Sequence, residues 1–338
     1  MKPTVLVTGA CGFVGSNLVK TALEKGFRVR ATDLPSANRD MLKDLSVEFI
    51  PSDVTKEATL RGVVDGAEYV FHPAAVFSYS ASWKTFKEVN ISGTENLCRA
   101  VIGAGDVKKF VLISTVEIYG ITPPDLLPAR EDAPKHPESL YAKSKLGQEK
   151  VVSRFRENYG LPAVIVRPGP IYGPGNYYGV AKMIQEPARL PFLAIPSNMN
   201  TRAPFVNIKD VCESLFFLAQ KDEAVGEAYN IVDDSSYTVY EFFKYLAFLL
   251  GKPFFTLPPV PAAHLKFRGK IAAKLSEAVS RLTREKPMIE EGYLIYVGND
   301  FRFSNEKLKS LGYQFIYPDV KEGIKETIAW YREEGLIK

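Results

Sequence analysis

The chain has 338 residues, of which 46% are hydrophobic and 24% charged. This composition is typical of a globular protein with a buried core. The formal net charge of +4 is too small for a nucleic-acid-binding protein, which needs a dense basic face. Three cysteines exclude a disulfide framework, and no apolar run approaches the roughly 18 residues of a transmembrane helix. We expect a cytoplasmic protein of two domains or one large one.

Short β-rich runs alternate with helical segments in the first half of the chain. We expect strands at 5–8, 28–32, 48–50, 69–72, 110–114 and 163–167, and helices at 16–26, 55–65, 85–104 and 139–159. Strands that alternate with helices of this length predict βαβ units and a parallel sheet.

The pattern loosens after residue 172, where prolines and glycines interrupt it. Strands are still expected at 205–208 and 228–232, and helices at 241–250, 265–284, 305–312 and 321–334. The pattern predicts an α/β fold with a doubly wound, Rossmann-like parallel sheet in residues 1–172, to which 208–235 return. Residues 173–338 are expected to form a smaller, interleaved α+β cap that binds the substrate.

A glycine-rich loop, TGACGFVGSNL, places Gly9, Gly12 and Gly15 between the first strand and the first helix. Without side chains, the backbone turns tightly and approaches a pyrophosphate, which then lies at the helix N-terminus. A plain strand–helix turn is the alternative interpretation. Asp33 ends the next strand 18 residues after Gly15, which is close to the spacing of a carboxylate that binds adenosine ribose hydroxyls.

The acid at position 33 also favours NAD over NADP, because a carboxylate repels a 2′-phosphate. The loop and Leu34, just after the acid, carry no basic side chain. Arg30 and Arg39 are the only nearby arginines that could reverse the preference.

The segment YAKSK places Tyr141 and Lys145 four residues apart, on one face of a predicted helix. A phenol is a poor base at neutral pH, because the pKa of a free tyrosine side chain is about 10. A neighbouring ammonium favours the phenolate and lowers that pKa, which makes tyrosine a usable acid or base. An exposed amphipathic helix with an incidental pair is the alternative.

The chain carries a specific order of motifs. TGACGFVGS, SDV, HPAAV, VNISGTENL, STVEIYG, YAKSK and RPGPIYGPG follow one another at intervals that resemble the extended short-chain dehydrogenase/reductase family, over about residues 4 to 335. The resemblance implies an NAD-dependent enzyme in which Tyr141 removes an alcohol proton, Thr115 steadies the oxygen, Lys145 binds the nicotinamide ribose, and hydride passes to the nicotinamide.

The resemblance also implies the residues around the cofactor. Asn90 would hold the proton-relay geometry, Ser114 would line the nicotinamide pocket, and Pro168 to Ile171 would meet the carboxamide. The full expected set is Gly9, Gly12, Phe13, Val14, Gly15, Asp33, Leu34, Asp53, Val54, Ala74, Ala75, Asn90, Ser114, Tyr141, Lys145, Pro168 and Ile171. No metal site is expected. A homodimer is implied, with segments 85–104 and 139–159 packing as a four-helix bundle.

Two features favour an apolar substrate. STVEIYG, with Glu117, resembles a segment of 3β-hydroxysteroid dehydrogenases. KPMI (Lys286–Ile289) followed by FRFSNEKLKSLGYQF resembles the 3β-hydroxysteroid and sterol-4-carboxylate dehydrogenase branch. We therefore predict an oxidoreductase of a sterol- or lipid-like secondary alcohol or ketone.

A nucleotide-sugar epimerase or dehydratase is the alternative. Such enzymes usually carry two diphosphate-binding arginines, but here Arg202 is one position out, Asp300 stands at the second position and Arg302 is offset. A non-catalytic regulator that senses NAD(H) is a third hypothesis, although it would not need to keep Thr115, Tyr141 and Lys145.

Other polar residues are expected to be structural. His72 is expected to have a structural role, because the histidines lack metal-ligand spacing. Glu131 and Asp132 are expected in a solvated loop.

The segment 264–286 predicts a basic amphipathic helix with a net charge of +5. Its apolar residues recur every three or four positions: Phe267, Ile271, Leu275, Val279 and Leu282. This apolar face would either close over the substrate or lie on an anionic membrane surface.

Overall fold

The computed structural model describes residues 2–78, 81–283, 294 and 297–338. The KPMI segment that supported the sterol branch lies outside these residues. In the described part of the chain, no helix has the length and hydropathy needed to cross a membrane.

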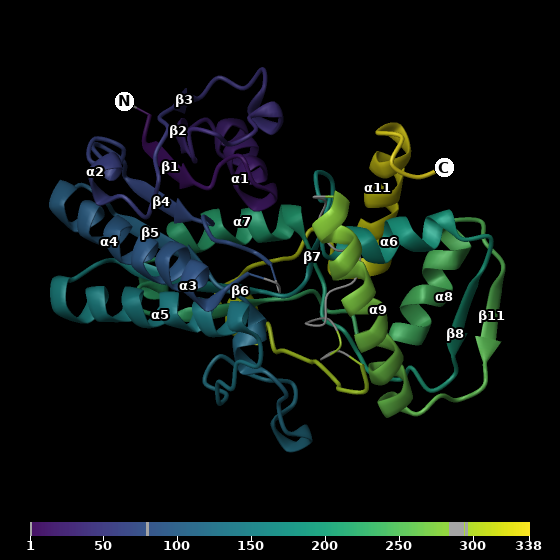
Figure 1. The fold of residues 1–338 in the computed structure, drawn as a ribbon. Coiled ribbons are helices and arrows are strands. Elements are labelled where there is room, and N and C mark those ends of the chain that lie inside the picture. Colours follow the sequence, from purple (N-terminus) through teal and green to yellow (C-terminus); the bar gives the residue numbers. More distant parts are fainter. Residues whose placement is uncertain (1, 79–80, 284–293, 295–296) are drawn as a thin grey trace.

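A parallel sheet of seven strands forms the centre of the described chain (Figure 1). Its spatial order is β10 (Ala228–Ile231), β6 (Ala163–Pro168), β5 (Lys109–Ile113), β4 (Tyr69–His72), β1 (Thr4–Thr8), β2 (Arg28–Thr32) and β3 (Glu48–Phe49). Val5 of β1 pairs with Val29 on one side and with Tyr69 on the other. The order of the chain reverses between β1 and β4, and ligands of doubly wound sheets bind outside the carboxyl ends of the strands at such a point.

The two faces of the sheet bury two separate hydrophobic layers. Alternate residues of a strand point to opposite faces, so Val5 and Val7 pack into one layer and Leu6 into the other. The first layer is covered by α1 (Phe13–Glu24) and α7 (Ile208–Ala219), and the second by α2 (Glu57–Leu60), α4 (Gly93–Ala104) and α5 (Leu140–Tyr159). The predicted Rossmann-like α/β fold is therefore confirmed.

The cap has a core of its own. It contains α6 (Val180–Arg189), α8 (Val239–Leu249), α9 (Ala262–Thr283) and α11 (Val320–Glu333), with β8 (Leu193–Pro196) paired in parallel to β11 (Phe254–Leu257). Ile184, Phe242, Leu246, Ile324 and Ile328 form the centre of its buried cluster. Figure 1 shows α6, α8, α9, β8 and β11 grouped at one end of the molecule.

Three smaller elements join the sheet to the cap. Strand β7 (Ile171–Tyr172) pairs with β9 (Val206–Asn207), and α10 (Glu306–Ser310) contacts β10. Because β10 joins the central sheet from beyond residue 208, the chain returns to the sheet after it enters the cap. The division at residue 172 stays a prediction.

Several elements differ from the sequence-based expectation. The helix expected at 55–65 is limited to α2, because Gly62 adopts a φ of 77° that ends helical geometry. Helix α6 was not predicted, because Pro187 indicated a break. That proline lies in the last turn, where it removes only one helical hydrogen bond.

Candidate active site

The glycine loop forms a cradle that only glycine fits. A Cβ at Gly15 would lie 2.1 Å from the carbonyl oxygen of Gly9, and one at Gly9, which has a φ of 59°, would lie 2.8 Å from Cα of Ala74. Helix α1 begins at Phe13, and the backbone at its N-cap, Gly12, is extended and offers no side-chain cap. The first N–H groups of α1, including that of Val14, therefore remain for an anion. The loop fits the pyrophosphate of a dinucleotide.

The Asp33 carboxylate is fixed at the edge of this loop. Its Oδ2 accepts a hydrogen bond of 2.9 Å from the backbone N–H of Cys11, and its Oδ1 accepts one of 2.8 Å from Leu34. The carboxylate is thus oriented by backbone groups on both sides, while the Leu34 side chain is exposed. This placement fits the proposed contact with ribose hydroxyls.

The two arginines that could favour a 2′-phosphate make other contacts. Arg30 donates to the carbonyl oxygens of Val63 (2.9 Å) and Asp65 (2.6 Å). Arg39 stacks over the ring of Phe49, with its guanidinium carbon 3.9 Å from the ring centroid. Both contacts are consistent with a preference for NAD.

The expected cofactor residues gather at one edge of the sheet. Gly9, Asp33, Asp53, Ala74 and Ser114 lie at or just beyond the carboxyl ends of β1, β2, β3, β4 and β5. Ala75 follows Ala74, Thr115 follows Ser114, Val54 packs on Gly93 of α4, Pro168 ends β6 and Ile171 begins β7. Since parallel strands end at a common edge, the structure brings these residues to one side of the molecule.

Tyr141, Lys145 and Thr115 come from two elements of this edge. Tyr141 and Lys145 lie one turn apart on α5, whose N-cap, Ser139, accepts a hydrogen bond from Ala142. Thr115 follows β5, and its Oγ1 accepts a 3.2 Å hydrogen bond from the N–H of Glu117. The hydroxyl proton of Thr115 is not used in that bond, so it can serve a substrate oxygen.

Ser114 carries a buried hydroxyl that is available to bind a ligand. Its side chain is buried, and its Oγ has no hydrogen-bond partner among the described residues. A buried hydroxyl without a partner costs free energy unless something else bonds to it. The Ser114 hydroxyl and the glycine cradle together fit NAD.

The pKa values of Tyr141 and Lys145 differ from the expectation. Burial, and then the charge of Glu117, raise the pKa of the Tyr141 phenol. Burial lowers the pKa of Lys145 to about 7, with Glu149 acting in the opposite direction. The predicted lowering of the Tyr141 pKa is therefore wrong for the protein by itself, because the burial that disfavours the phenolate also disfavours the ammonium.

Asn90 joins the loop after β4 to α5 through hydrogen bonds. It lies in a π-helical turn (Lys87–Ser92) that links α3 (Trp83–Phe86) to α4. Its Oδ1 accepts from Val76 N–H (2.8 Å) and its Nδ2 donates to Ser144 Oγ (2.8 Å), which in turn donates to the carbonyl oxygen of Tyr141 (2.7 Å). Asn90 therefore positions the turn of α5 that bears Tyr141. Ser144 was not singled out in the sequence.

His72 extends this network through the interior. It bonds to Thr8 Oγ1 (2.8 Å) and to Thr94 Oγ1 (2.9 Å), which also accepts from Gln148 of α5 (2.7 Å). Because Thr94 gives its own proton to the carbonyl oxygen of Asn90, Nε2 of His72 carries the ring proton and Nδ1 accepts from Thr8. Burial, followed by the charge of Lys145, lowers the His72 pKa to about 3, so the ring stays neutral at ordinary pH.

The predicted solvated loop at 131–132 needs a correction. Asp132 is exposed, but Glu131 is half-buried, and its carboxylate accepts a 2.9 Å hydrogen bond from the N–H of Asn230 in β10. Burial raises its pKa. Sequence reasoning missed this contact because the two residues are 99 positions apart.

Two arginines of the cap meet at one carboxylate. Asp300 accepts from the backbone N–H of Arg202 (2.7 Å), from its guanidinium (3.3 Å) and from the guanidinium of Arg302 (3.0 Å). All three side chains are partly exposed, yet Nε of Arg202 is buried and has no partner among the described residues. The cluster carries a net charge of +1 and keeps unused donors.

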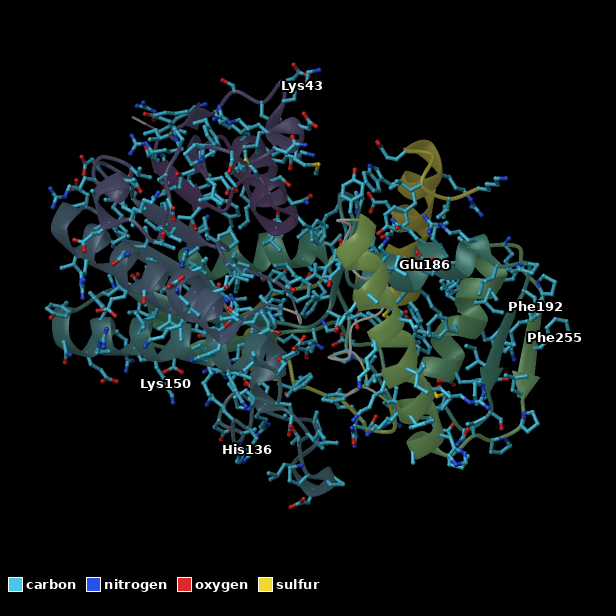
Figure 2. All side chains as sticks on the ribbon, viewed as in Figure 1. Lys43, His136, Lys150, Glu186, Phe192 and Phe255 are labelled. Carbon is cyan, nitrogen blue, oxygen red and sulfur yellow. The ribbon has the colours of Figure 1, made fainter. Side chains whose placement is uncertain are left out.

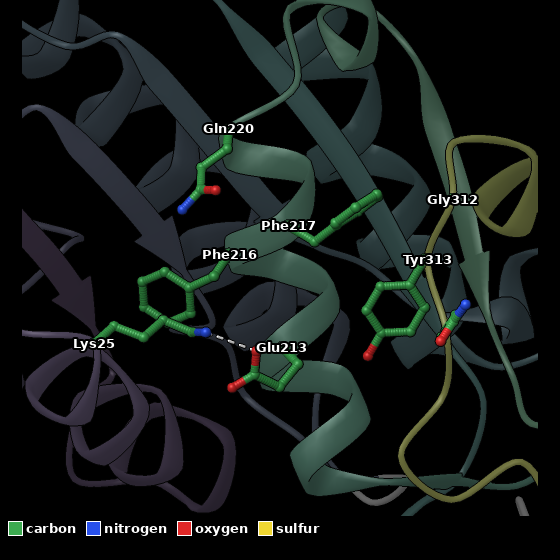
Figure 3. A pocket seen from close by; sticks show the side chains of 8 residues that line it. Lys25, Glu213, Phe216, Phe217, Gln220, Gly312 and Tyr313 are labelled. Carbon is green, nitrogen blue, oxygen red and sulfur yellow. Dashed lines mark ion pairs between the residues drawn. The ribbon is translucent and has the colours of Figure 1, made fainter.

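A surface hollow elsewhere holds none of the expected site residues. It is lined by residues from the end of α1, from α7 and from the 312–314 segment, including Phe216 and Tyr313, and an ion pair of 2.7 Å joins Lys25 and Glu213 across it (Figure 3). In the part of the chain that the structure describes, no group of histidine, cysteine and acidic side chains is arranged to hold a metal ion.

Comparison with known proteins agrees with this geometry. Residues 5–232 match the family described as "NAD dependent epimerase/dehydratase family". The chain is 29% identical to UDP-glucose 4-epimerase of Vibrio cholerae (84% of this chain, 86% of the relative). It is 27% identical to short-chain dehydrogenase/reductase family 42E member 1 of Xenopus laevis (100% and 90%).

The fold agrees with a solved structure as well. UDP-glucose 4-epimerase of Thermotoga maritima with UDP-glucose superimposes with a TM-score of 0.76 at 26% identity, over 98% of this chain and 99% of that one. The family match covers more than half of the chain. The protein therefore belongs to the NAD dependent epimerase/dehydratase family of enzymes, a membership that confirms the predicted cofactor, NAD.

Proposed function

We propose that this enzyme is a nucleotide-sugar epimerase or dehydratase that oxidises a secondary alcohol of the sugar in the course of its reaction. The observation that carries the proposal is that Thr115, Tyr141 and Lys145 lie on elements that follow the carboxyl end of β5, at the same sheet edge as a loop that fits a dinucleotide. Similarity to a UDP-glucose 4-epimerase supports the substrate class. This assignment was the alternative in the sequence analysis, and it is now favoured over the sterol-like substrate.

In this mechanism the chain's own residues hold and move the alcohol proton. NAD, when bound, accepts the hydride and can return it. Tyr141 exchanges the proton of the reacting oxygen, and the Thr115 hydroxyl donates a hydrogen bond to that oxygen. Because the pKa of Tyr141 is raised, the phenol is protonated at neutral pH and is ready to act as an acid. To act as a base, it needs added positive charge nearby, which a protonated Lys145 supplies.

The remaining cofactor contacts follow from the same placement. The N–H groups at the start of α1 would hold the pyrophosphate, Asp33 the adenosine ribose, and Ser114 the nicotinamide side. Lys145 would bind the nicotinamide ribose. A homodimer through α4 and α5 and the boundary of the cap at residue 172 remain part of this proposal.

The Arg202–Asp300–Arg302 cluster is the proposed diphosphate site. Two guanidinium groups at one point suit a diphosphate, which accepts forked, charge-assisted hydrogen bonds. Asp300 orients both groups, and the net charge of the cluster remains positive.

A dehydrogenase of an apolar secondary alcohol is the second candidate, close to the 3β-hydroxysteroid and sterol-4-carboxylate branch. The observation that favours it is Asp300, which stands where nucleotide-sugar enzymes usually carry an arginine. Its carboxylate forms ion pairs with both Arg202 and Arg302 and so competes with a diphosphate for them. Similarity to a 42E short-chain dehydrogenase/reductase over the whole chain also supports it.

One substrate screen separates the two candidates. The enzyme is incubated with NAD and either UDP-glucose, dTDP-glucose or a panel of apolar secondary alcohols. Sugar products are followed by NMR and reduced nicotinamide by absorbance. Conversion of a nucleotide sugar without net NADH supports the proposal, whereas NADH formed only with apolar alcohols contradicts it and supports the second candidate.

The arginine cluster provides a second arm of this test. We expect Arg202→Met/Arg302→Met to weaken nucleotide-sugar binding at least about tenfold, since each lost charge-assisted hydrogen bond costs about 1.5–3 kcal/mol. Arg61→Met is the control, since Arg61 is an exposed arginine in the part of the molecule built on the seven-stranded sheet, which we call the sheet half. Equal affinity in both variants would remove the cluster from the proposed site.

A further inference from the structure

Helix α9 turns its largest apolar side chains toward solvent. Phe267, Ile271, Leu275 and Val279 are 66%, 47%, 64% and 56% exposed. They follow one another at intervals of four residues, so they form one stripe along the helix. The stripe consists of the apolar residues that the sequence pattern singled out, except that the Leu282 side chain lies outside the described residues.

The opposite face of α9 packs on the protein through small residues. Ala273 is buried, and Gly269, Ala272 and Ser276 are half-buried. A Cβ at Gly269 would lie 2.4 Å from a Leu294 methyl carbon, so the glycine lets α9 lie close to that side chain. The helix therefore contacts the rest of the molecule with its small residues. The structure does not fit an apolar stripe that closes over the substrate, which was one of the two expected roles.

The charge of α9 is concentrated and positive. Residues 262–283 include five basic residues and one acidic residue, a net charge of +4 that equals the charge of the whole chain. Arg268, Lys270 and Lys274 are exposed, as the apolar stripe is. The remainder of the chain is therefore neutral on balance.

We propose that the outer face of α9 binds an anionic lipid surface, with the stripe of Phe267, Ile271, Leu275 and Val279 inserted at the headgroup level. Large apolar side chains flanked by cations are the chemistry that a helix lying in a membrane interface requires. Each basic side chain near such a surface adds to the attraction. The lipid surface accounts for both the exposed stripe and the charge, and it does not depend on which substrate the enzyme uses.

Co-sedimentation of the NAD-loaded full chain with vesicles tests the proposal. We expect binding to vesicles of phosphatidylcholine with added phosphatidylglycerol, weaker binding to phosphatidylcholine alone, and a decline as salt is raised. Arg268→Glu/Lys274→Glu and Phe267→Ser/Leu275→Ser should each lower the binding constant at least about tenfold. Both pairs should leave turnover unchanged, because none of these side chains belongs to the proposed site.

Matched controls come from the sheet half of the molecule. Lys2→Glu/Lys43→Glu changes the same charge at exposed lysines, and Tyr159→Ser removes an equally exposed ring; both should bind vesicles like the parent enzyme. Equal binding by parent and α9 variants, or no binding at low salt, overturns the proposal. It is also overturned if light scattering shows a dimer that Phe267→Ser/Leu275→Ser dissociates while vesicles stay unbound, since a second copy then covers the stripe.

Discussion

The most exposed phenylalanines of the described chain lie on the cap and not in the sheet half. In the sheet half, Phe71, Phe86 and Phe110 are fully buried, whereas on the cap Phe248, Phe255 and Phe267 are more than half exposed. Phe192 and Phe255 contact each other edge to face at the outer edge of the cap (Figure 2).

Polar groups show the reverse pattern. The sheet half buries Asn90, His72 and Arg167 with hydrogen bonds to defined partners, while the cap displays lysines and arginines on α9. An interior that holds reacting groups needs fixed polar contacts, because an unsatisfied buried group is costly. The outer cap carries exposed apolar surface instead, which is suited to contact with another surface.

The largest expected effect tests the catalytic function of the buried polar groups. Tyr141→Phe should lower kcat by about 10²- to 10⁴-fold because it removes the group that we propose exchanges the proton. NAD affinity should change little, since only one hydroxyl is lost. Turnover assays and NAD titration measure the two effects. Tyr159→Phe, on the same helix but exposed, serves as the control, and near-normal kcat in Tyr141→Phe would refute the assignment.

A buried ion pair between Arg167 and Glu149 joins β6 to α5. Arg167 of β6 donates to both carboxylate oxygens of Glu149 (3.0 and 2.9 Å) and to the hydroxyl of Tyr119 (2.7 Å). Arg167→Met should lower the free energy of unfolding by about 3–5 kcal/mol, because it leaves the Glu149 charge buried without its partner. Urea denaturation measures the loss.

An exposed ion pair on the same helix serves as the comparison for the buried pair. Arg154→Met, which removes an exposed ion pair of α5 with Glu95, should cost no more than about 1 kcal/mol. Arg167→Met/Glu149→Met should recover most of the stability lost in the single variant. Equal losses from Arg154→Met and Arg167→Met would contradict the comparison between the buried interior and the surface.

Lys145 makes the interior sensitive to pH. Its pKa falls from an ordinary 10.5 to about 7 in the folded protein, so between these values the unfolded chain binds more protons than the folded one. The free energy of unfolding should therefore rise with pH in this window, by up to about 1.4 kcal/mol per pH unit. Urea denaturation of the parent and of Lys145→Met at about pH 7.5 and about pH 9.5, both within this window, isolates the effect.

The quantity to compare is the change in unfolding free energy between the two pH values, measured for the parent and for Lys145→Met. Lys145→Met lacks the titrating group, so its stability should gain less than that of the parent as pH rises. The removal of Lys145 also removes a charge that lowers the His72 pKa, but His72 titrates far below this window and stays neutral within it in both proteins. If the two stability curves run parallel, Lys145 is not held in the low-pKa state.

The sequence predicted the sheet half more closely than the cap. Strands β2 and β4 begin and end at the predicted residues, because parallel strands buried on both faces are short β-rich runs with polar ends. The start of α5 was predicted to within one residue, and the structure shows that Ser139 is its N-cap. In the cap, β7, β8 and α6 were missed, because short elements among prolines carry too weak a pattern for a prediction.

The site shows a similar limit. Motifs predicted which residues gather at the sheet edge, but not the bonds between them: Asn90 and Ser144 are 54 residues apart, as are Thr94 and Gln148. Such pairs become neighbours only when α4 and α5 pack. The period of α9 likewise predicted two faces, but periodicity alone does not tell which face packs on the protein.

The smallest expected effect is that of Phe248→Ala on α8, which is compared with Phe242→Ala on the same helix. Phe242 is buried and stacks on Phe205, with ring centroids 4.8 Å apart, whereas Phe248 is 76% exposed. Phe242→Ala should cost about 3–5 kcal/mol of unfolding free energy, as a cavity in a packed core does. Phe248→Ala should change it by no more than about 0.5 kcal/mol. Urea denaturation of both variants at two protein concentrations tests whether the cap is well packed inside and uncovered outside. If Phe248→Ala were as costly as Phe242→Ala, and the cost grew with protein concentration, a second copy of the chain would cover Phe248 in solution, and the contrast between a buried sheet half and an open cap surface would fail at this residue.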